Sequence, residues 1–318
     1  MTFHLFGNIL TFYGVAANNR SQTENNITTL QKIFWQGETH TKISAEAIRW
    51  AIRYYWQKAG YPVNRVWKDN PLPDEKNPHR QDSNFDAEKY IDDDLLGFME
   101  TESPKKEPND QSQSRTSGKN KQVKKSPPKG SVKNRRGALD VTRAVSMTPF
   151  VGRATFNSKS GNQKNKTSLY GTEFHGTSYQ FGFGITPESC KDKSRIFPLL
   201  DALVSICRVG GNHGRFLFDF APESIVLRWT HDFAPRFLYC FEEDEMGNLS
   251  IPKLSRQIKS GDLKPQELWI GGEIIETLQG SEYAEVHQFS GIKETVDSLS
   301  KKISEDILSC PIKPTKRE

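Results

Sequence analysis

The N-terminal apolar segment, residues 3–15, carries aromatic and β-branched side chains on both of its alternating faces. This pattern is typical of a central strand that is covered on each side. Residues 44–59 follow with apolar positions at helical spacing, with Ser44 in place to cap the first turn and Gly60 directly after the last. We therefore predict an amphipathic helix that carries Arg49 and Arg53 on a face that does not pack.

The second half of the chain alternates strands with one more helix. Residues 151–185 contain two aromatic-rich runs on either side of SKSGNQKNK, which predicts a long β-hairpin with a basic tip. A second helix is predicted over residues 197–209, with Pro198 in its first turn, and it ends at GGNHG. Further strands are predicted at residues 215–220, 224–229, 236–241 and 267–275. This order indicates an α+β fold, a ferredoxin-like sheet with helices on one face and long insertions.

Positive charge is concentrated in one part of the chain. Of the 318 residues 35% are hydrophobic, and the formal net charge is +5. Residues 103–136 contain eleven Lys or Arg and two acidic residues, so this segment carries +9 and the remainder of the chain −4. The low hydrophobicity of residues 103–133 predicts disorder in the free chain. Because the rest of the chain has a net negative charge, a basic surface on the folded part must be confined to one region of it.

The cysteines and the N-terminus favour a cytoplasmic protein. The four cysteines are far apart, without a C-x-x-C pair or a metal-binding spacing with histidine, which suits a reducing compartment. The chain has no apolar run of about eighteen residues, and its N-terminus lacks the basic region and cleavage site of a signal peptide. We expect a soluble, untargeted protein.

The segment YIDDDLLGFM, residues 90–99, raises the question of a metal site. A divalent ion needs carboxylates that converge from separate elements, and three consecutive aspartates cannot all point one way. Asp92 to Asp94 are more simply interpreted as an N-terminal helix cap, after which LLGFM docks into the body. The seven histidines stand apart, and no serine or cysteine lies in a nucleophile context. Neither an enzyme nor a cofactor site is therefore expected.

Three segments combine positive or donor groups with accessible surface. Lys42 precedes the first predicted helix, whose free N–H groups attract anions, and Arg49 and Arg53 extend the same patch. The glycines of GGNHG expose backbone amides. The hairpin tip lies between Phe156 and Tyr170, which suits tracking of a single strand and stacking on its bases. The first two features also have purely structural interpretations, solvated helix charges and an ordinary helix end, and both are open here.

Four motifs in order carry a family resemblance: KISAEAIR, YIDDDLLGFM, RRGALDVTRAVSMTPFVG and GGNHGRFLFDFAPESIVLRWT. Together they resemble the backbone subunit of the type I CRISPR Cascade, in the DevR branch of the RAMP superfamily and type I-B-like. The resemblance implies a modified RNA-recognition-motif (ferredoxin-like) palm, a fingers insertion and a β-hairpin thumb. The implied boundaries are 1–63 and 184–318 for the palm, 64–136 for the fingers with the basic tract at 103–133, and 137–183 for the thumb.

The resemblance also implies a function without catalysis. Such subunits polymerise along CRISPR RNA, hold the guide by its phosphates and present it for pairing with target DNA. The implied partners are the guide RNA, the target DNA, other copies of the chain, and the large, capping and small Cascade subunits. Whether transposition proteins are partners as well is left open. No cofactor, metal or membrane is implied.

Matching the family's motifs residue by residue gives a set of predicted contacts. The implied RNA-binding residues are Asn18, Asn19, Arg20, Lys42, Ser44, Arg49, Arg53, Arg135, Arg136, Arg143, Ser146, Arg153, Gly211, Asn212 and His213, and those on the thumb are Phe156, Lys164, Lys166 and Tyr170. The three aspartates resemble the family's fixed entry to the fingers, where they would cap and position that segment, also against arginines of a neighbouring copy. The length of the basic tract departs from the family.

Two rival interpretations stand beside this one. The first is a metal-dependent endoribonuclease of the same superfamily that uses Asp92 to Asp94. Related RNA-cleaving subunits use an aspartate in the loop after the first strand, where this chain offers amides, Arg20 and Glu24, and this departure disfavours a nuclease. The second is an interaction protein whose basic tract binds nucleic acid non-specifically.

Overall fold

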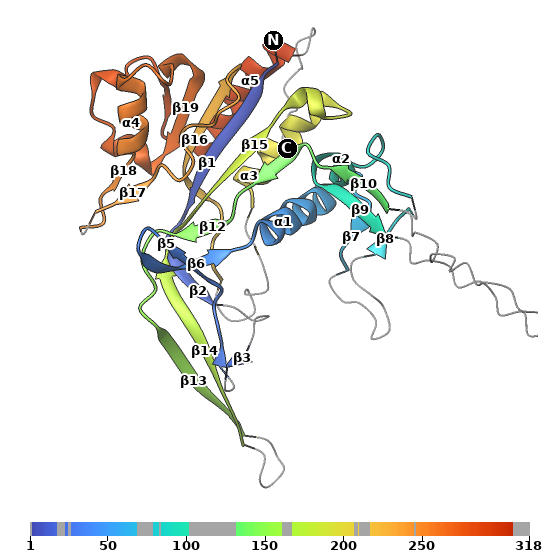
Figure 1. The fold of residues 1–318 in the computed structure, drawn as a ribbon, viewed down its shortest axis with the longest axis vertical. Coiled ribbons are helices and arrows are strands. Elements are labelled where there is room, and N and C mark those ends of the chain that lie inside the picture. The colour runs from blue at the N-terminus through green and yellow to red at the C-terminus, as the bar shows by residue number, and fades with distance from the viewer. Residues whose placement is uncertain are drawn as a thin grey trace, which may run out of the picture.

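The computed structural model of the chain describes residues 2–17, 23–24, 27–68, 79–82, 84–101, 132–160, 167–206, 209, 217–244 and 246–307. Its frame is a nine-stranded sheet with β1 (His4–Thr11) at the centre. The strands β15 (Tyr179–Ile185) and β16 (Pro222–Thr230) flank β1, and both run antiparallel to it. The strand order is β20-β19-β16-β1-β15-β12-β6-β5, and β11 also pairs with β15 (Figure 1).

The outer strands of this sheet come from three separate parts of the chain. They are β5 (Lys32–Trp35), β6 (Glu38–Ile43), β11 (Leu139–Val141), β12 (Ala144–Ser146), β19 (Leu268–Gly272) and β20 (His287–Phe289). Within this sheet β19 and β20 pair in parallel, and the other described pairs of outer strands are antiparallel. The predicted strand at 224–229 is thus confirmed as β16, the central neighbour of β1. The opening strand predicted over residues 3–15 is confirmed only in part, because β1 ends at Thr11 and Gly14–Ala17 form a separate strand outside this sheet.

The predicted first helix is confirmed as α1 (Ala45–Lys58). Ser44 is its N-cap, and the Ser44 hydroxyl accepts a hydrogen bond from the backbone N–H of Ala47 at 3.2 Å. A cap of this kind typically contributes about 1 kcal/mol to helix stability. The apolar face of α1 is buried against the sheet, with Ile52 and Trp56 fully covered.

Helices cover both faces of the sheet. One face packs under α1, α3 (Ile196–Val204) and α5 (Ile292–Ile307), through inward residues of β1 such as Leu5 and Ile9. The other face packs under α4 (Pro252–Lys259) and the preceding loop, and α4 lies across the strands from α1 (Figure 1). The prediction of helices on one face only is therefore wrong, because no helix was expected in the C-terminal part that forms α4.

Several predicted boundaries are also wrong. The second helix ends at Val204 instead of residue 209, and the strand expected at 267–275 gives way after Gly272 to a 3₁₀-helix. Residues 236–241 form a turn in which Arg236 and Tyr239 have positive φ angles of 64° and 55°. Residues 217–220 lie outside any strand. Phe218, Phe220, Phe237 and Phe241 in these loops are nevertheless buried against the sheet, whereas Leu217 is exposed.

The predicted hairpin is confirmed as β13 (Arg153–Ser160) and β14 (Thr167–Thr177), and it projects away from the main sheet (Figure 1). Its second strand also pairs with the short strands β2 (Gly14–Ala17) and β4 (Ile27–Thr28), and β3 (Thr23–Glu24) pairs with β4. The predicted thumb boundaries of 137–183 are too wide, because β11, β12 and most of β15 belong to the main sheet.

The insertion after α1 packs beside that helix. It contains β7 (Arg65–Val66), β8 (His79–Arg80), α2 (Ile91–Leu95), β9 (Gly97–Thr101) and β10 (Val132–Arg136). The antiparallel pair β9–β10 joins the two ends of the basic tract, of which residues 103–131 lie outside the described residues and residues 132–133 belong to β10. The pair sits close to α2, since a Cβ atom at Gly137 would lie 2.5 Å from the carbonyl oxygen of Leu95. The remaining strands, β17 (Glu242–Glu243) and β18 (Leu249–Ser250), form a short hairpin before α4.

A buried polar network joins the hairpin to the sheet. The ring of His175 on β14 lies with Nδ1 2.8 Å from Thr41 Oγ1 and Nε2 3.2 Å from Thr148 Oγ1. Thr41 Oγ1 also lies 2.7 Å from the hydroxyl of Tyr179. Burial lowers the pKa of His175, and the nearby His40 ring acts in the same direction. The folded state therefore favours the neutral form of the His175 ring.

This network predicts a loss of stability in acid. A histidine whose pKa is lower in the folded than in the unfolded state binds more protons when unfolded, so the free energy of unfolding should fall as the pH decreases below about 6.5. Urea denaturation at a series of pH values measures this dependence. We expect His175→Gln to weaken this pH dependence. Part of it should remain in the variant, because burial also lowers the pKa of His4. An unchanged pH dependence in the variant would contradict this assignment.

Candidate nucleic-acid interface

Cationic side chains gather at the start of α1. In the register of β6 and β12, Lys42 lies opposite Val145. Arg143 directly precedes β12, so it lies at the end of this strand pair from which α1 begins. The pKa of Glu46, in the first turn of α1, is lowered by a hydrogen bond from its own backbone and further by Arg49 and Arg143. Lys42, Arg49 and Arg143 therefore surround a helix N-terminus, which itself favours anions.

A basic groove continues from this point between α1 and the insertion. It has a volume of about 550 Å³ and is lined by the side chains or backbone of Arg49, Arg65, Leu96, Gly97, Phe98, Met99, Arg135, Arg136, Gly137, Leu139 and Asp140. We call it the arginine groove. Among the described residues that line it, Asp140 is the one acidic residue, and it pairs with Arg136 at 3.0 Å. The groove therefore has an excess of positive charge.

Two donors in the arginine groove lack acceptors. The Nε atoms of Arg49 and Arg135 are buried, and neither has a hydrogen-bond partner within the described part of the chain. A buried donor without a partner costs about 1–3 kcal/mol, and the cost is larger for a charged group. An oxyanion in the groove would neutralise part of the charge of the arginines that line it.

The first of the three consecutive aspartates fixes one wall of the groove. Asp92 Oδ2 accepts from Arg53 Nε at 3.0 Å and from the backbone N–H of Arg65 at 3.1 Å, and Asp92 Oδ1 accepts from the backbone N–H of Asn64 at 2.7 Å. The Asp92 side chain is fully buried. Because it holds the backbone at Arg65, this carboxylate sets where that arginine enters the groove.

Asp93 and Asp94 point to different partners. Asp93 Oδ2 accepts from Asn64 Nδ2 at 2.8 Å and from the backbone N–H of Asp86 at 3.0 Å, and its pKa is raised, mainly by burial. Asp94 accepts from Arg135 Nη2 at 2.6 Å and from Arg195 Nη1 at 2.7 Å. Arg135 lines the arginine groove, so the Asp94 carboxylate holds the opposite wall in place.

These contacts correct the interpretation of the aspartate run. The N-cap of α2 is Tyr90, which makes no side-chain cap, and the three aspartates lie within the helix. Their arginine partners belong to the same chain rather than to a neighbouring copy. The expectation that the aspartates position the insertion is confirmed, and so is the expectation that their carboxylates diverge.

Aromatic rings support the insertion next to the groove. The rings of Phe85 and Phe98 stack with centroids 4.1 Å apart and an interplanar angle of 2°. The guanidinium of Arg65 lies 5.6 Å from the Phe85 centroid, and that of Arg80 lies 4.5 Å from it. Such cation–π contacts favour a flat guanidinium orientation and contribute about 0.5–1 kcal/mol at exposed sites.

Comparison with known proteins decides the family. No protein-family model matches the chain. The protein "CRISPR-associated protein Cas7/Cst2/DevR" of Myxococcus xanthus (strain DK1622) is 42% identical over 301 residues, which cover 90% of this chain and 91% of that protein. The chain belongs to the Cas7/Cst2/DevR family of CRISPR-associated proteins.

Solved structures show the fold of this Cas7/Cst2/DevR chain in large assemblies. A chain from a "CRISPR RNA-guided surveillance complex" matches with a TM-score of 0.53 at 11% identity and covers 94% of this chain and 99% of its own length. A chain from a "CRISPR RNA-guided surveillance complex, pre-nicking" matches with a TM-score of 0.56 at 7% identity and covers 93% and 98%. The α+β fold with one large sheet is therefore shared with these chains.

The structure brings together part of the predicted set. Lys42, Ser44, Arg49 and Arg143 lie around the start of α1, and Arg49 extends into the arginine groove with Arg135 and Arg136. The exposed Arg153 and Phe156 lie on the separate hairpin strand β13.

Two predicted RNA contacts are corrected. Ser146 is buried, and its hydroxyl donates to the carbonyl of Thr148 and accepts from the backbone N–H of Thr41, so it joins strands instead of facing solvent. Arg53 lies on the expected side of α1, but its guanidinium is held by the buried Asp92. We therefore assign both residues to the support of the interface.

The remaining predictions fall outside the described residues. These are Asn18, Asn19, Arg20, Lys164, Lys166, Gly211, Asn212 and His213, together with the side chain of Tyr170. Conversely, the sequence interpretation missed Arg65 and the buried Arg195. No local pattern marks either one, because each is placed by an aspartate far away along the chain.

Among the helices that the structure describes, none combines the length and the apolar character of a membrane-spanning segment.

Proposed function

We propose that this chain is a non-catalytic, guide-RNA-binding subunit that polymerises along CRISPR RNA and forms the backbone of a type I Cascade. The observation that carries the proposal is the arginine groove, which is lined by four arginines from three elements: Arg49 of α1, Arg65 of β7, and Arg135 and Arg136 of β10. Because the groove is lined by several arginines, it is suited to binding a polyanion. Membership in the Cas7/Cst2/DevR family and the likeness to chains of surveillance complexes support the choice of RNA as that polyanion.

The proposed contacts are to phosphates. Arg49, Arg65 and Arg136 would neutralise backbone phosphates in the groove, and Lys42 with Arg143 would continue the track past the N-terminus of α1. Contacts of this kind fix the path of a strand without reading its sequence. The base edges then face away from the phosphate-binding side, where they are free to pair with target DNA.

The order of the elements supports the family's domain names for this chain. In support of a modified RNA-recognition-motif palm, four strands lie in the order β16-β1-β15-β11, with α1 between β1 and β11 along the chain and α3 between β15 and β16. The insertion between α1 and β11 corresponds to the fingers, and the β13–β14 hairpin to the thumb. The proposed partners are other copies of the chain and the large, capping and small Cascade subunits, in the cytoplasm. We propose no role with transposition proteins.

Burial of the aspartates supports a role without catalysis. Asp92, Asp93 and Asp94 are 1%, 1% and 0% exposed, and protein donors occupy five of their six oxygens. A metal-dependent ribonuclease needs carboxylates that can meet both a hydrated ion and a phosphate. The alternative of an endoribonuclease that uses these three residues is therefore disfavoured by the geometry of α2.

The proposal predicts that the purified full chain carries RNA. We expect the bound nucleic acid to be sensitive to ribonuclease, to consist of guide sequences and to remain intact during incubation with Mg²⁺. The observed affinity should fall linearly with salt on logarithmic axes, because phosphate binding releases counterions. A variant that lacks residues 103–133 should retain the RNA, since the groove lies on the folded body. Loss of all RNA on this deletion would favour the rival in which the basic tract alone binds nucleic acid.

A further inference from the structure

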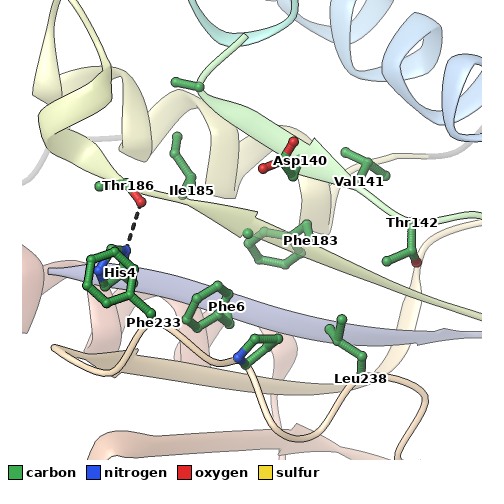
Figure 2. Close-up of a pocket in the computed structure, with 13 residues that line it drawn as sticks. His4, Phe6, Asp140, Val141, Thr142, Phe183, Ile185, Thr186, Phe233 and Leu238 are labelled. Atoms are coloured by element: carbon green, nitrogen blue, oxygen red, sulfur yellow. Dashed lines mark hydrogen bonds between the residues drawn. The ribbon is translucent and has the colours of Figure 1, made fainter. Parts of the chain in front are cut away.

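A second cavity lies on the sheet face opposite α1, between β1, β11, β15 and the loop that follows β16 (Figure 2). Its volume is about 330 Å³, and its lining includes Phe6, Gly184 and Phe233. The cavity exists because β15 ends in FGFGI, where the two residues that face this side of the sheet, Gly182 and Gly184, have no side chain to fill it. A Cβ atom at Gly184 would lie 3.0 Å from the ring of Phe6, so glycine lets that ring lie close against the strand. We call this cavity the aromatic pocket.

The rim of the aromatic pocket carries an unusually exposed ring. Phe233 is 81% exposed, although its ring centroid lies only 4.5 Å from that of the buried His4 (Figure 2). His4 in turn is stacked on Phe6, with centroids 6.0 Å apart and an interplanar angle of 15°. An aromatic side chain that is left in water beside a hollow offers a flat apolar surface to a flat ligand.

Polar atoms are placed among these rings. His4 Nδ1 lies 2.8 Å from Thr186 Oγ1, while the buried His4 Nε2 has no partner in the described part of the chain. Asp140 and Thr142 stand on the opposite side of the pocket (Figure 2). An apolar cavity with a few polar groups, at the lower end of the usual size of small-ligand sites, suits a heteroaromatic ring better than an aliphatic chain.

The aromatic pocket adjoins the arginine groove. Asp140 lines both cavities, and the strand β11 to which it belongs separates them. One cavity is rich in guanidinium groups, and the other is rich in aromatic surface. A phosphate and a base that are joined by one ribose have this same separation of charge and flat apolar surface.

We propose that the aromatic pocket receives one nucleobase of the RNA strand whose phosphates occupy the arginine groove. The base stacks against Phe233 and Phe6 and directs polar ring atoms to His4 or Asp140. This inference rests on the proposed function, because it takes the strand in the groove to be RNA. The other occupant that such a surface suits, an apolar side chain of a protein partner, is an outcome of the test below.

The test compares an intact RNA with a backbone that lacks its bases. A labelled single-stranded RNA and a ribose-phosphate chain of equal length are titrated with the full-length protein, and binding is followed by fluorescence anisotropy. We expect Phe233→Ala to weaken binding of the intact RNA about tenfold and to leave binding of the abasic chain unchanged. Phe34→Ala is the matched control, because Phe34 is 75% exposed but lines neither cavity, and we expect it to change neither affinity.

The outcomes separate this proposal from the one on which it rests. If Phe233→Ala leaves both affinities unchanged, or weakens both equally, the aromatic pocket does not hold a base, while RNA binding by the wild type still supports the groove. If the variant binds both chains normally but loses a Cascade subunit, the pocket is a protein-docking site and the proposal is overturned. If the wild type binds neither chain, the proposed function fails, and this inference fails with it.

Discussion

Asp94→Asn is expected to lower the free energy of unfolding by about 3–5 kcal/mol, the range found when one member of a buried ion pair is removed. Asp94 is fully buried and accepts hydrogen bonds from Arg135, Arg195 and the backbone of Lys191. Without its charge, the buried guanidinium of Arg195 loses its carboxylate partner, and Arg135 loses the contact that holds it in the arginine groove. Chemical denaturation of wild type and variant measures the difference.

Asp140→Asn is the matched control for this experiment. Asp140 also pairs with an arginine of β10, Arg136, at 3.0 Å, but both side chains are largely exposed. Exposed pairs contribute about 0–1 kcal/mol, so we expect a small effect. If Asp94→Asn were no more destabilising than Asp140→Asn, the aspartate run would not be the anchor of the insertion.

The combined reversal of Arg49→Glu and Arg136→Glu is expected to weaken RNA binding by at least about a hundredfold near physiological salt. Each lost phosphate contact on a single strand should also reduce the slope of log affinity against log salt by about 0.7. Arg49 and Arg136 come from two different elements, α1 and β10, and both line the groove, so the double change replaces two of its positive charges by negative ones. Titration of a labelled RNA at several salt concentrations gives both quantities.

A control of equal charge is Lys253→Glu combined with Lys302→Glu. These exposed lysines lie on α4 and α5, and neither lines the groove. The total charge changes by the same amount, so any long-range effect is shared by the two double variants. Equal weakening by both would show that overall charge binds the RNA, and the assignment of the arginine groove would be wrong.

The family and the general kind of site were within reach of the sequence. The motifs around KISAEAIR and YIDDDLLGFM are contiguous, and the family that they indicate agrees with the 42% identical relative. Arg49 and Arg136 could be proposed as contacts because they stand inside such motifs. Arg65 could not, because its place in the groove depends on Asp92, 27 positions further along the chain.

Local structure was predictable where neighbours in sequence decide it. Ser44, the apolar spacing of α1 and Gly60 determine that helix within about sixteen residues. Apolar side chains on both faces indicate β1, and two aromatic-rich runs around a basic tip indicate the β13–β14 hairpin. The sequence by itself therefore determined the first helix, the central strands and the hairpin. Short-range hydrogen bonds and side-chain periodicity are sufficient for these elements.

Only the tertiary structure decided what the three aspartates do and which face of the sheet α4 covers. The sequence does not distinguish an aspartate exposed to water from one buried against Arg195, because the two differ only in the partners that the fold brings to them. The same holds for the two cavities beside β11, because the walls of the aromatic pocket come from segments as far apart as His4 and Leu238. Sequence periodicity carries no information on such contacts, because they form only when separate elements pack together.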